Sequence, residues 1–162
     1  MLSTNMRLKF QIVTPERIVL REEIDSLTCP TQMGEITVLP NHIPLIASLQ
    51  PGELTARMGD RAEHIAVSGG FVEIRPGNEV IVLADTAEHS DEIDTVRAEE
   101  AKRKAEEEMK AASTRSSEEY AQLAAVIQKN LARLKVARRR TSMPHLGSQH
   151  RASPRPDDII NS

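Results

Sequence analysis

Up to about residue 88 the chain consists of short apolar runs separated by turn-forming residues. Leu8–Val13 alternates apolar and polar side chains, which is typical of a strand with one buried face. Pro and Gly recur between the runs, as at Pro51-Gly52. Many short strands bounded by such residues favour an antiparallel β-sandwich or barrel. The other runs predict strands at Ile18–Leu20, Ile24–Cys29, Ile36–Leu39, Leu54–Met58, His64–Ser68, Phe71–Arg75 and Val80–Ala84.

Two of these runs carry more specific predictions. Ile65–Ile74 contains Gly69-Gly70 between two apolar stretches, which predicts a hairpin whose turn needs the backbone freedom of glycine. Val80–Ala84 is apolar on both faces, so we expect a central strand.

From Asp91 to Arg140 the pattern changes to helical periodicity, and the segment contains no Gly and no Pro. A first apolar stripe consists mostly of alanine: Ala98, Ala101, Ala105, Met109 and Ala112. After a polar break, the second stripe is larger: Tyr120, Leu123, Ile127, Leu131 and Leu134. The two stripes predict an antiparallel two-helix hairpin. Because alanine buries little apolar area, we expect a weakly held hairpin that can act as a movable arm.

The patterns together give a fold class and four segments. We predict an N-terminal antiparallel β-sandwich followed by a C-terminal antiparallel two-helix hairpin. The sandwich spans residues 7–88 and the hairpin residues 89–140, after a flexible start at residues 1–6. Residues 141–162 are rich in Pro and Ser, contain Gly147 and show no periodicity, which predicts a disordered tail.

Composition narrows the protein class. The chain has 162 residues, a formal net charge of −3 and a single cysteine, Cys29. One cysteine cannot form an intrachain disulfide, which fits a reducing compartment. No apolar run approaches the ~20 residues that span a bilayer. We therefore expect a soluble intracellular protein that reaches a membrane only through a partner.

Charge is unevenly distributed along the chain. Residues 1–90 contain 7 Lys and Arg against 12 Asp and Glu, whereas residues 91–140 contain 12 against 10. Six basic residues accumulate near the end of the second helix: Lys129, Arg133, Lys135, Arg138, Arg139 and Arg140. The helix dipole accounts for two or three of them. The remainder favours contact with an acidic surface, with a simple solvated helix end as the alternative.

The motifs of common enzyme classes are missing from the sequence. The five histidines are scattered, and none has the spacing of a metal site. No phosphate-binding loop, dinucleotide fingerprint or nucleophile elbow is present. We therefore predict neither a catalytic residue nor a metal site, and a chain that is not itself an enzyme.

Three stretches are informative through their motifs and their order along the chain. Leu39–Leu45, followed by Leu49–Gly52, is close to an LPxHxPL…LxPG pattern, and Ser68–Ile74 is close to an SGGFxEV pattern. Ala84–Ala87 is followed by Ile93–Ala98 and Glu100–Ala105, where the helical periodicity begins. In this order the three stretches resemble the epsilon subunit of bacterial F-type ATP synthases, and the likeness covers about residues 7–140.

This resemblance implies a non-catalytic subunit of the central stalk, the rotor of the F1 sector. In this role the sandwich couples the gamma subunit to the ring of c subunits for proton-driven ATP synthesis. The helical arm either folds onto the sandwich or extends into the alpha/beta head, where it inhibits ATP hydrolysis. The implied location is peripheral, on the cytoplasmic face of the bacterial cell membrane, without a nucleic-acid partner.

The resemblance also implies contact residues. On the c-ring side these are Glu35, Asn41 and His42. Residues that meet an acidic segment of the beta subunit are Arg133, Lys135, Arg138, Arg139 and Arg140.

Some family members bind ATP on the folded hairpin through an [IL]DxxRA motif, which Ile93–Ala98 fits in full. No cofactor is required, and ATP would act as a regulatory ligand. The implied site consists of Ile93, Asp94, Arg97, Ala98, Lys129 and Arg133. Lys129 departs from the arginine expected there, because an ammonium group cannot form a planar bidentate contact. The alternative is that Asp91, Glu92 and Asp94 favour a helix start, and that Arg97 forms a surface ion pair with Asp94.

Two other functions compete with the rotor subunit. A nucleic-acid-binding module would use the basic second helix, but the negative net charge and the scarcity of aromatic residues argue against it. The second is a freestanding scaffold, which would not associate with a gamma subunit.

Overall fold

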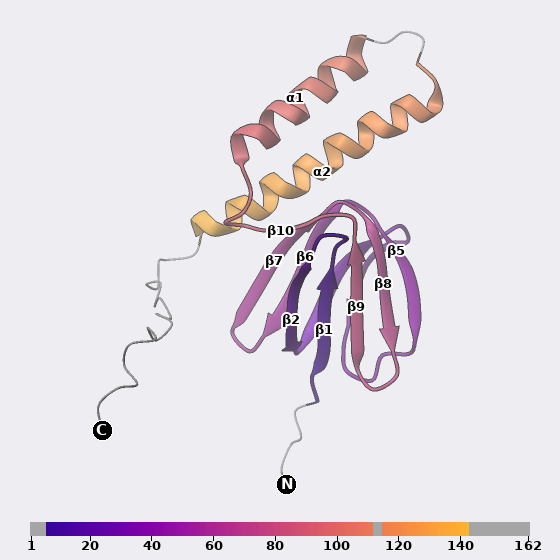
Figure 1. Cartoon of the computed structure of the whole chain (residues 1–162), viewed down its shortest axis with the longest axis vertical. Helices are drawn as coiled ribbons and strands as arrows, with labels where there is room; N and C mark the ends of the chain where they lie inside the picture. The colour runs from indigo at the N-terminus through magenta and orange to yellow at the C-terminus, as the bar shows by residue number, and fades with distance from the viewer. Residues whose placement is uncertain (1–5, 112–114, 143–162) are drawn as a thin grey trace, which may run out of the picture.

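The computed structural model describes residues 6–111 and 115–142, with side chains up to Arg139. Within these ranges, ten strands precede two helices (Figure 1). The strands are β1 Leu8–Val13, β2 Ile18–Ile24, β3 Ser26–Thr31, β4 Gly34–Val38, β5 Leu45–Leu49, β6 Gly52–Met58, β7 Arg61–Val67, β8 Gly70–Arg75, β9 Glu79–Ala84 and β10 Ala87–His89. The helices are α1 Thr95–Ala111 and α2 Ser117–Ser142. This order confirms the predicted fold class.

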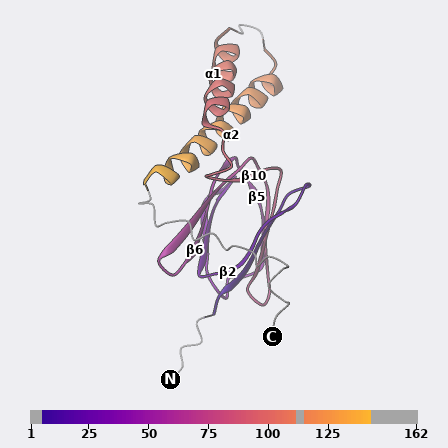
Figure 2. The ribbon, with the colours of Figure 1, turned by 60° about the vertical axis from the view of Figure 1, so that its left-hand side comes forward.

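The strands form one hydrogen-bonded path that bends into two facing layers (Figure 2). Its order is β10-β7-β6-β3-β5-β8-β9-β1-β2, with β4 added to β3. β1 pairs with β9 in parallel, and every other pairing between described strands is antiparallel. The bend places one face of each strand in the interior, which is how a sandwich encloses a core.

The core lies between the two layers and is almost entirely aliphatic. In β1 the predicted alternation is confirmed, since Leu8, Phe10 and Ile12 are buried while Lys9 is exposed. Each fully buried large apolar side chain contributes about 1.5–3 kcal/mol. Other residues in this core include Ile24, Leu27, Val38, Leu54, Ile65, Val67, Val72, Val80 and Val82.

The predicted hairpin at Ile65–Ile74 is wrong. β7 pairs with β6 and β10, whereas β8 pairs with β5 and β9, so the chain passes from one set of strands to another at Gly69-Gly70. Gly70 has a φ of 121°, and a Cβ atom there would lie 2.0 Å from the carbonyl oxygen of Leu83. The glycines therefore permit a crossover and a close backbone approach, and not a tight turn.

Two further differences concern the strands. β9 is central, as predicted, with β8 and β1 on either side, although Leu83 on one of its faces is 50% exposed. β5 and β10 were not predicted as strands. β5 follows Pro44 and presents Ile46 to the surface, which hides its alternation, and β10 has only three residues.

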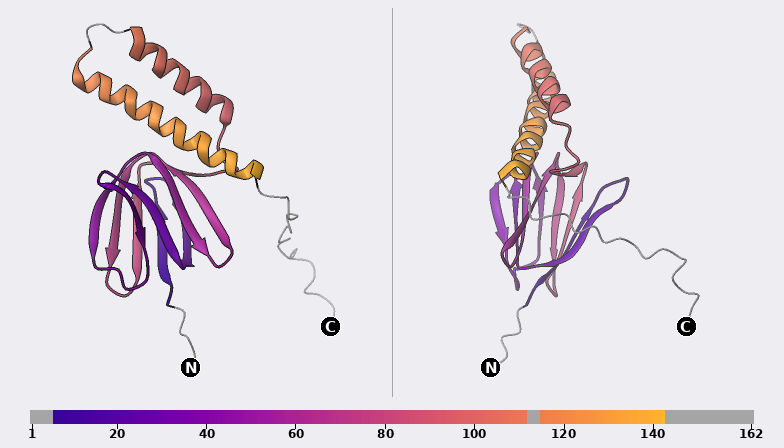
Figure 3. Two further views of the ribbon diagram at one scale, coloured as in Figure 1. Left: turned by 180° about the vertical axis from the view of Figure 1, so that it is seen from behind. Right: turned by 90° about the vertical axis from the view of Figure 1, so that its left-hand side faces the viewer.

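The two helices form the predicted antiparallel hairpin, which rises from one end of the sandwich (Figure 3). Ala98 and Ala105 of α1 are buried, as the first stripe predicts. The start of α2 is closed by Ser116 and Glu119, whose side chains each accept a hydrogen bond from the other's backbone nitrogen, a capping box. The capping box defines where the second helix begins.

The predicted stripe of α2 is only partly buried. Leu134 is buried, but Tyr120 and Leu131 are exposed. The reason is that α2 changes partner along its length. It packs on α1 and then on β6, β7 and β10, where Val136 and Ala137 are buried. Ala112, the last residue of the first stripe, lies outside the described residues.

The predicted flexible start and tail lie almost wholly outside the described residues. α2 continues to Ser142, two residues into the segment predicted as tail.

Candidate functional site

A cavity of about 620 Å³ lies where the sandwich meets both helices. The turn between β1 and β2 contributes one wall, the segment from β9 to β10 another, and facing positions of α1 and α2 close it. Four of the six predicted nucleotide-site residues line this cavity: Asp94, Arg97, Lys129 and Arg133. The fold therefore brings together residues from both ends of the hairpin.

The other two predicted residues have packing positions. Ile93 is buried in a small cluster with Ala66, Val136 and Ala137, and Ala98 is fully buried. Ile93 thus helps to attach α2 to the sandwich, and Ala98 allows close packing at the start of α1. Neither residue lines the cavity wall.

Asp94 caps α1. Its Oδ1 accepts a hydrogen bond from the backbone nitrogen of Arg97 over 3.1 Å, as an N-cap side chain does. The helix start that formed the alternative interpretation is therefore present. The accompanying ion pair is not, because the Arg97 side chain forms no ion pair with a described residue and instead borders the cavity.

Arg133 is the most constrained cation of the cavity. It forms two hydrogen bonds to the Glu88 carboxylate, of 2.7 and 3.0 Å, and a third of 3.2 Å to Asn130 Oδ1. Asn130 is itself buried, and its amide donates to the carbonyl of Val126. These contacts orient the guanidinium, the group best suited to bidentate binding of a carboxylate or a phosphate.

The cavity also contains residues that sequence reasoning missed. Arg17 and Glu92 form an ion pair across 75 positions of sequence, and Glu88 belongs to the three-residue strand β10. The hydrogen bond from Arg17 lowers the pKa of Glu92. No local pattern marks these residues, because each is an ordinary surface charge until the fold sets it beside the hairpin.

The charges in the cavity are mixed. Arg17 and Arg133 are paired with carboxylates, whereas Lys129, like Arg97, forms no ion pair with a described residue. An anionic ligand would find two unpaired cations and one guanidinium already oriented. It would also meet the carboxylates of Glu88 and Glu92, which oppose an anion unless they rearrange.

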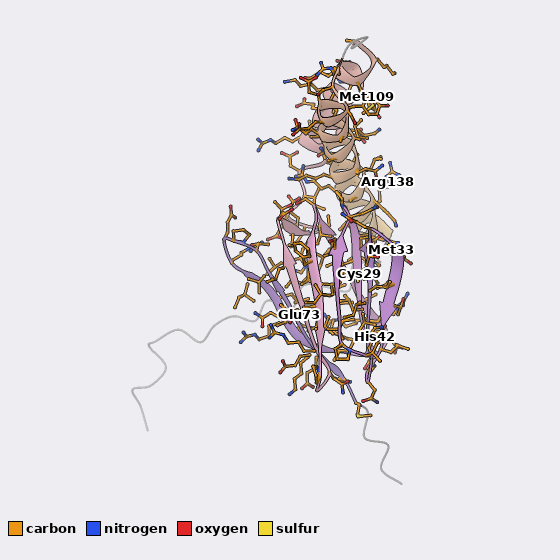
Figure 4. All side chains as sticks on the ribbon, turned by 90° about the vertical axis from the view of Figure 1, so that its right-hand side faces the viewer. Cys29, Met33, His42, Glu73, Met109 and Arg138 are labelled. Carbon is orange, nitrogen blue, oxygen red and sulfur yellow. The ribbon has the colours of Figure 1, made fainter. Side chains whose placement is uncertain are left out.

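The basic end of α2 lies against a second acidic group, Glu53 of β6. Lys135 Nζ is 2.9 Å from Oε2 of Glu53, and Arg139 Nε is 3.1 Å from Oε1. Arg138 is exposed (Figure 4), and the side chain of Arg140 lies outside the described part of the chain. Because Lys135 and Arg139 are paired with Glu53, the folded chain does not favour the nucleic-acid interpretation.

The predicted c-ring residues do not lie together. Glu35 is close to Met33, at the end of β4 nearer the helices, whereas His42 lies beyond the other end of the strand (Figure 4). Asn41 is next to His42, and its backbone nitrogen bonds to Asn78 Oδ1 over 2.6 Å. The separation follows from the extended strand between them.

An exposed apolar face occupies the outside of β5, β8 and β9. Phe71 and Leu83 are paired across β8 and β9, and Ile46 of β5 projects from the same face. All three side chains are at least half exposed. Contiguous apolar surface of this kind marks an interaction site. Over the described residues, no helix is long and apolar enough to cross a membrane.

The resemblance found in the sequence is confirmed by family models. The beta-sandwich domain of the ATP synthase delta/epsilon chain matches residues 7–90, and the long alpha-helix domain of that chain matches residues 91–138. An ATP synthase epsilon chain of Dehalococcoides mccartyi is 44% identical over 146 residues, covering 86% of this chain and 99% of the relative. An ATP synthase epsilon chain of Herpetosiphon aurantiacus is 43% identical, covering 83% and 97%.

Solved structures share the fold. A chain of the Euglena gracilis mitochondrial ATP synthase complex of OSCP, F1 and c-ring superposes with a TM-score of 0.68 at 21% identity, covering 81% of each chain. A chain of the central stalk and c-ring of the Tetrahymena thermophila mitochondrial ATP synthase gives 0.58 at 13% identity, covering 85% of this chain and 98% of the other. Since the two family models span residues 7–138 and relatives above 40% identity match almost end to end, the chain belongs to the ATP synthase delta/epsilon chain family.

Proposed function

We propose that the chain is the epsilon subunit of a bacterial F-type ATP synthase, a non-catalytic part of the central stalk. Membership of the delta/epsilon family supports this role. The subunit couples gamma to the c-ring and belongs to the peripheral F1 sector, on the cytoplasmic face of the membrane. It reaches the membrane only through the complex.

The apolar face of Ile46, Phe71 and Leu83 is the proposed contact with gamma. Its support is physical, because large apolar side chains exposed on a flat sheet gain free energy when a partner covers them. Phe71→Glu should abolish co-purification with gamma, whereas Ile18→Glu, an equally exposed position on β2, should not. Retention of gamma by Phe71→Glu would exclude this face.

Glu35, Asn41 and His42 remain the predicted c-ring contacts. Because they lie at different ends of β4, Glu35→Gln and His42→Ala test two separate surfaces. The variant whose F1 sector binds c-ring membranes more weakly identifies the end that faces the ring. If neither variant weakens binding, these residues do not form the contact.

The helical arm is the proposed inhibitor of ATP hydrolysis. The observation that carries this function is the small apolar cluster between α2 and the sandwich, which ion pairs supplement. An arm held in this way can leave and present Arg133, Lys135, Arg138, Arg139 and Arg140 to an acidic segment of the beta subunit.

Truncation tests the arm in the assembled enzyme. A chain ending at Ala111 should assemble normally and raise ATP hydrolysis, because the basic helix is gone. A chain ending at Ser142 is the matched control, since it keeps both helices, and it should leave the rate unchanged. Unchanged hydrolysis in the shorter chain would disprove inhibition by the arm.

ATP is the proposed regulatory ligand of the cavity. Arg97 and Lys129 would contact phosphate, and Arg133 would exchange Glu88 for it. Calorimetric titration of the full chain with ATP should show binding that Arg97→Ala weakens about tenfold, the effect of one lost charge-assisted hydrogen bond. Arg103→Ala is the control, because Arg103 is exposed on α1 and pairs with Glu107. Equal affinity in both variants would remove Arg97 from the site.

A further inference from the structure

Glu53 is a buried carboxylate that faces the arm. Its side chain is 4% exposed, although it belongs to strand β6 at the surface of the sandwich. Lys135 and Arg139, one helical turn apart on α2, each contact a different oxygen of this carboxylate. A ring nitrogen of His64, on the neighbouring strand β7, lies 2.6 Å from Oε1.

Helix α2, with Lys135 and Arg139, lies over the carboxylate of Glu53. Lys135 and Arg139 remain 63% and 46% exposed, so both reach inward from a wet helix surface to a dry carboxylate. The apolar contact around them is small and consists of Ala66, Ile93, Val136 and Ala137. With so little apolar area, the charged contacts have a large share in holding α2 down.

The same two basic side chains belong to the set that would meet an acidic partner. These nitrogens lie about 3 Å from Glu53 while α2 rests on β6, so an arm that leaves the sandwich for another subunit gives up both contacts. Glu53 and the partner therefore compete for one basic surface.

We propose that Glu53 is an internal competitor of the acidic partner, which keeps the arm folded by occupying Lys135 and Arg139. The competition rests on the proposed inhibitory function, whereas the folding contact itself does not. The balance between arm positions is then set in this chain by a sandwich residue that never touches the catalytic head. Loss of Glu53 leaves the basic surface free and favours the extended arm.

The contact is tested first in the isolated full chain. Spin labels at Glu23→Cys on β2 and Gln122→Cys on α2, both exposed positions, report the distance between arm and sandwich. Cys29 does not interfere, because burial raises the pKa of its thiol to about 12. Glu53→Gln should raise the ratio of extended to folded arms about tenfold.

Two further variants separate the contact from general damage to the sandwich. Glu63→Gln is the matched control, since Glu63 pairs with Arg61 and His89 and not with α2, and it should leave the distances unchanged. Lys135→Gln/Arg139→Gln removes the helix side of the contact and should open the arm as Glu53→Gln does. Adding Glu53→Gln to that pair should open it little further, because the interaction is already lost. Unchanged distances in both Glu53→Gln and Lys135→Gln/Arg139→Gln would overturn the proposal.

In the assembled enzyme, substitutions on the two sides of the contact should have opposite effects on the rate of ATP hydrolysis. Glu53→Gln should lower ATP hydrolysis, because more arms are extended with their basic residues intact. Lys135→Gln/Arg139→Gln should raise hydrolysis, because the arm opens without the residues that hold it to the head. If both variants open the isolated arm and neither changes hydrolysis, the folding contact stands and the competition, together with inhibition by the arm, is disproved.

Discussion

Arg133 and Glu88 form a bidentate ion pair across 45 positions of sequence. Nε donates to Oε2 over 2.7 Å and Nη2 donates to Oε1 over 3.0 Å, so two N–H groups of one guanidinium bind both oxygens of the carboxylate. The pair joins α2 to β10, at the end of the cavity proposed for ATP. A phosphate that takes Arg133 from Glu88 must therefore replace a contact between arm and sandwich with one of its own.

Arg133→Lys should weaken the attachment of the arm by about 1–2 kcal/mol, because lysine keeps the charge but cannot bind both carboxylate oxygens in the plane. Amide hydrogen exchange of residues 126–137 measures the change. Arg138→Lys, at an exposed position of the same helix, should exchange as the unmodified chain does. Equal exchange in the two variants would mean that the bidentate geometry contributes nothing.

Gly70→Ala should destabilise the sandwich by about 3 kcal/mol or more, since the new Cβ atom would lie 2.0 Å from a backbone oxygen that cannot move aside. Gly77→Ala is the comparison. Its φ of 81° is also positive, but a Cβ atom there would meet nothing within 4 Å, so we expect about 1–2 kcal/mol. Urea unfolding of the two variants measures the difference, and similar midpoints would contradict steric exclusion at Gly70.

Acid should release the arm through Glu53. Burial of this carboxyl opposes its ionisation, but hydrogen bonds from Lys135 and Arg139 outweigh burial, and the pKa falls below the ordinary value of 4.5. His64, Lys135 and Arg139 are the ionisable groups that face it. A lowered pKa means that the stabilisation is complete above pH 4.5 and is lost as the pH falls further through the folded-state pKa.

The spin-label distance, followed from pH 6 to pH 3, measures this release. Glu53→Gln should already have its higher ratio of extended to folded arms at pH 6, and this ratio should change less over the range. Equal opening over this range in Glu53→Gln and in the chain that keeps Glu53 would contradict a role for its charge.

Cys29 should react with a thiol reagent only after the sandwich unfolds. The side chain is buried, and burial raises the pKa of the thiol to about 12, so the reactive thiolate is scarce at neutral pH. The rate of modification in increasing urea should follow the unfolding curve. Rapid modification of the folded chain would show that β3 opens locally.

Periodicity and turn residues were enough to predict a series of short strands followed by two helices, because these depend on neighbours along the chain, although β5 and β10 were missed. The alternation in Leu8–Val13 and the alanine stripe of α1 are examples. The hairpin prediction at Gly69-Gly70 was wrong, because the same dipeptide is compatible with a tight turn and with a crossover between strands. The pairing of the flanking strands decides between a turn and a crossover, and this pairing depends on residues far away in the sequence.

The candidate site was predictable only in part, for the same reason. The Ile93–Ala98 motif identified Asp94 and Arg97, which line the cavity. Glu53 was not predictable, because it is a single acidic residue in an ordinary strand. Its partner Arg139 lies 86 positions away, on an element whose placement the local sequence does not contain.

The parallel pairing of β1 with β9 also constrains the order in which the chain can fold during its synthesis. Lys9 lies opposite Glu79, so the first strand has no partner on that side until most of the sandwich has left the ribosome. Contacts this distant in sequence form slowly and together. The helices are synthesised after the strands and arrive at a surface that β6, β7 and β10 have already completed. A newborn arm thus meets Glu53 on its own chain before it meets any other subunit, so the folded position is where each molecule begins.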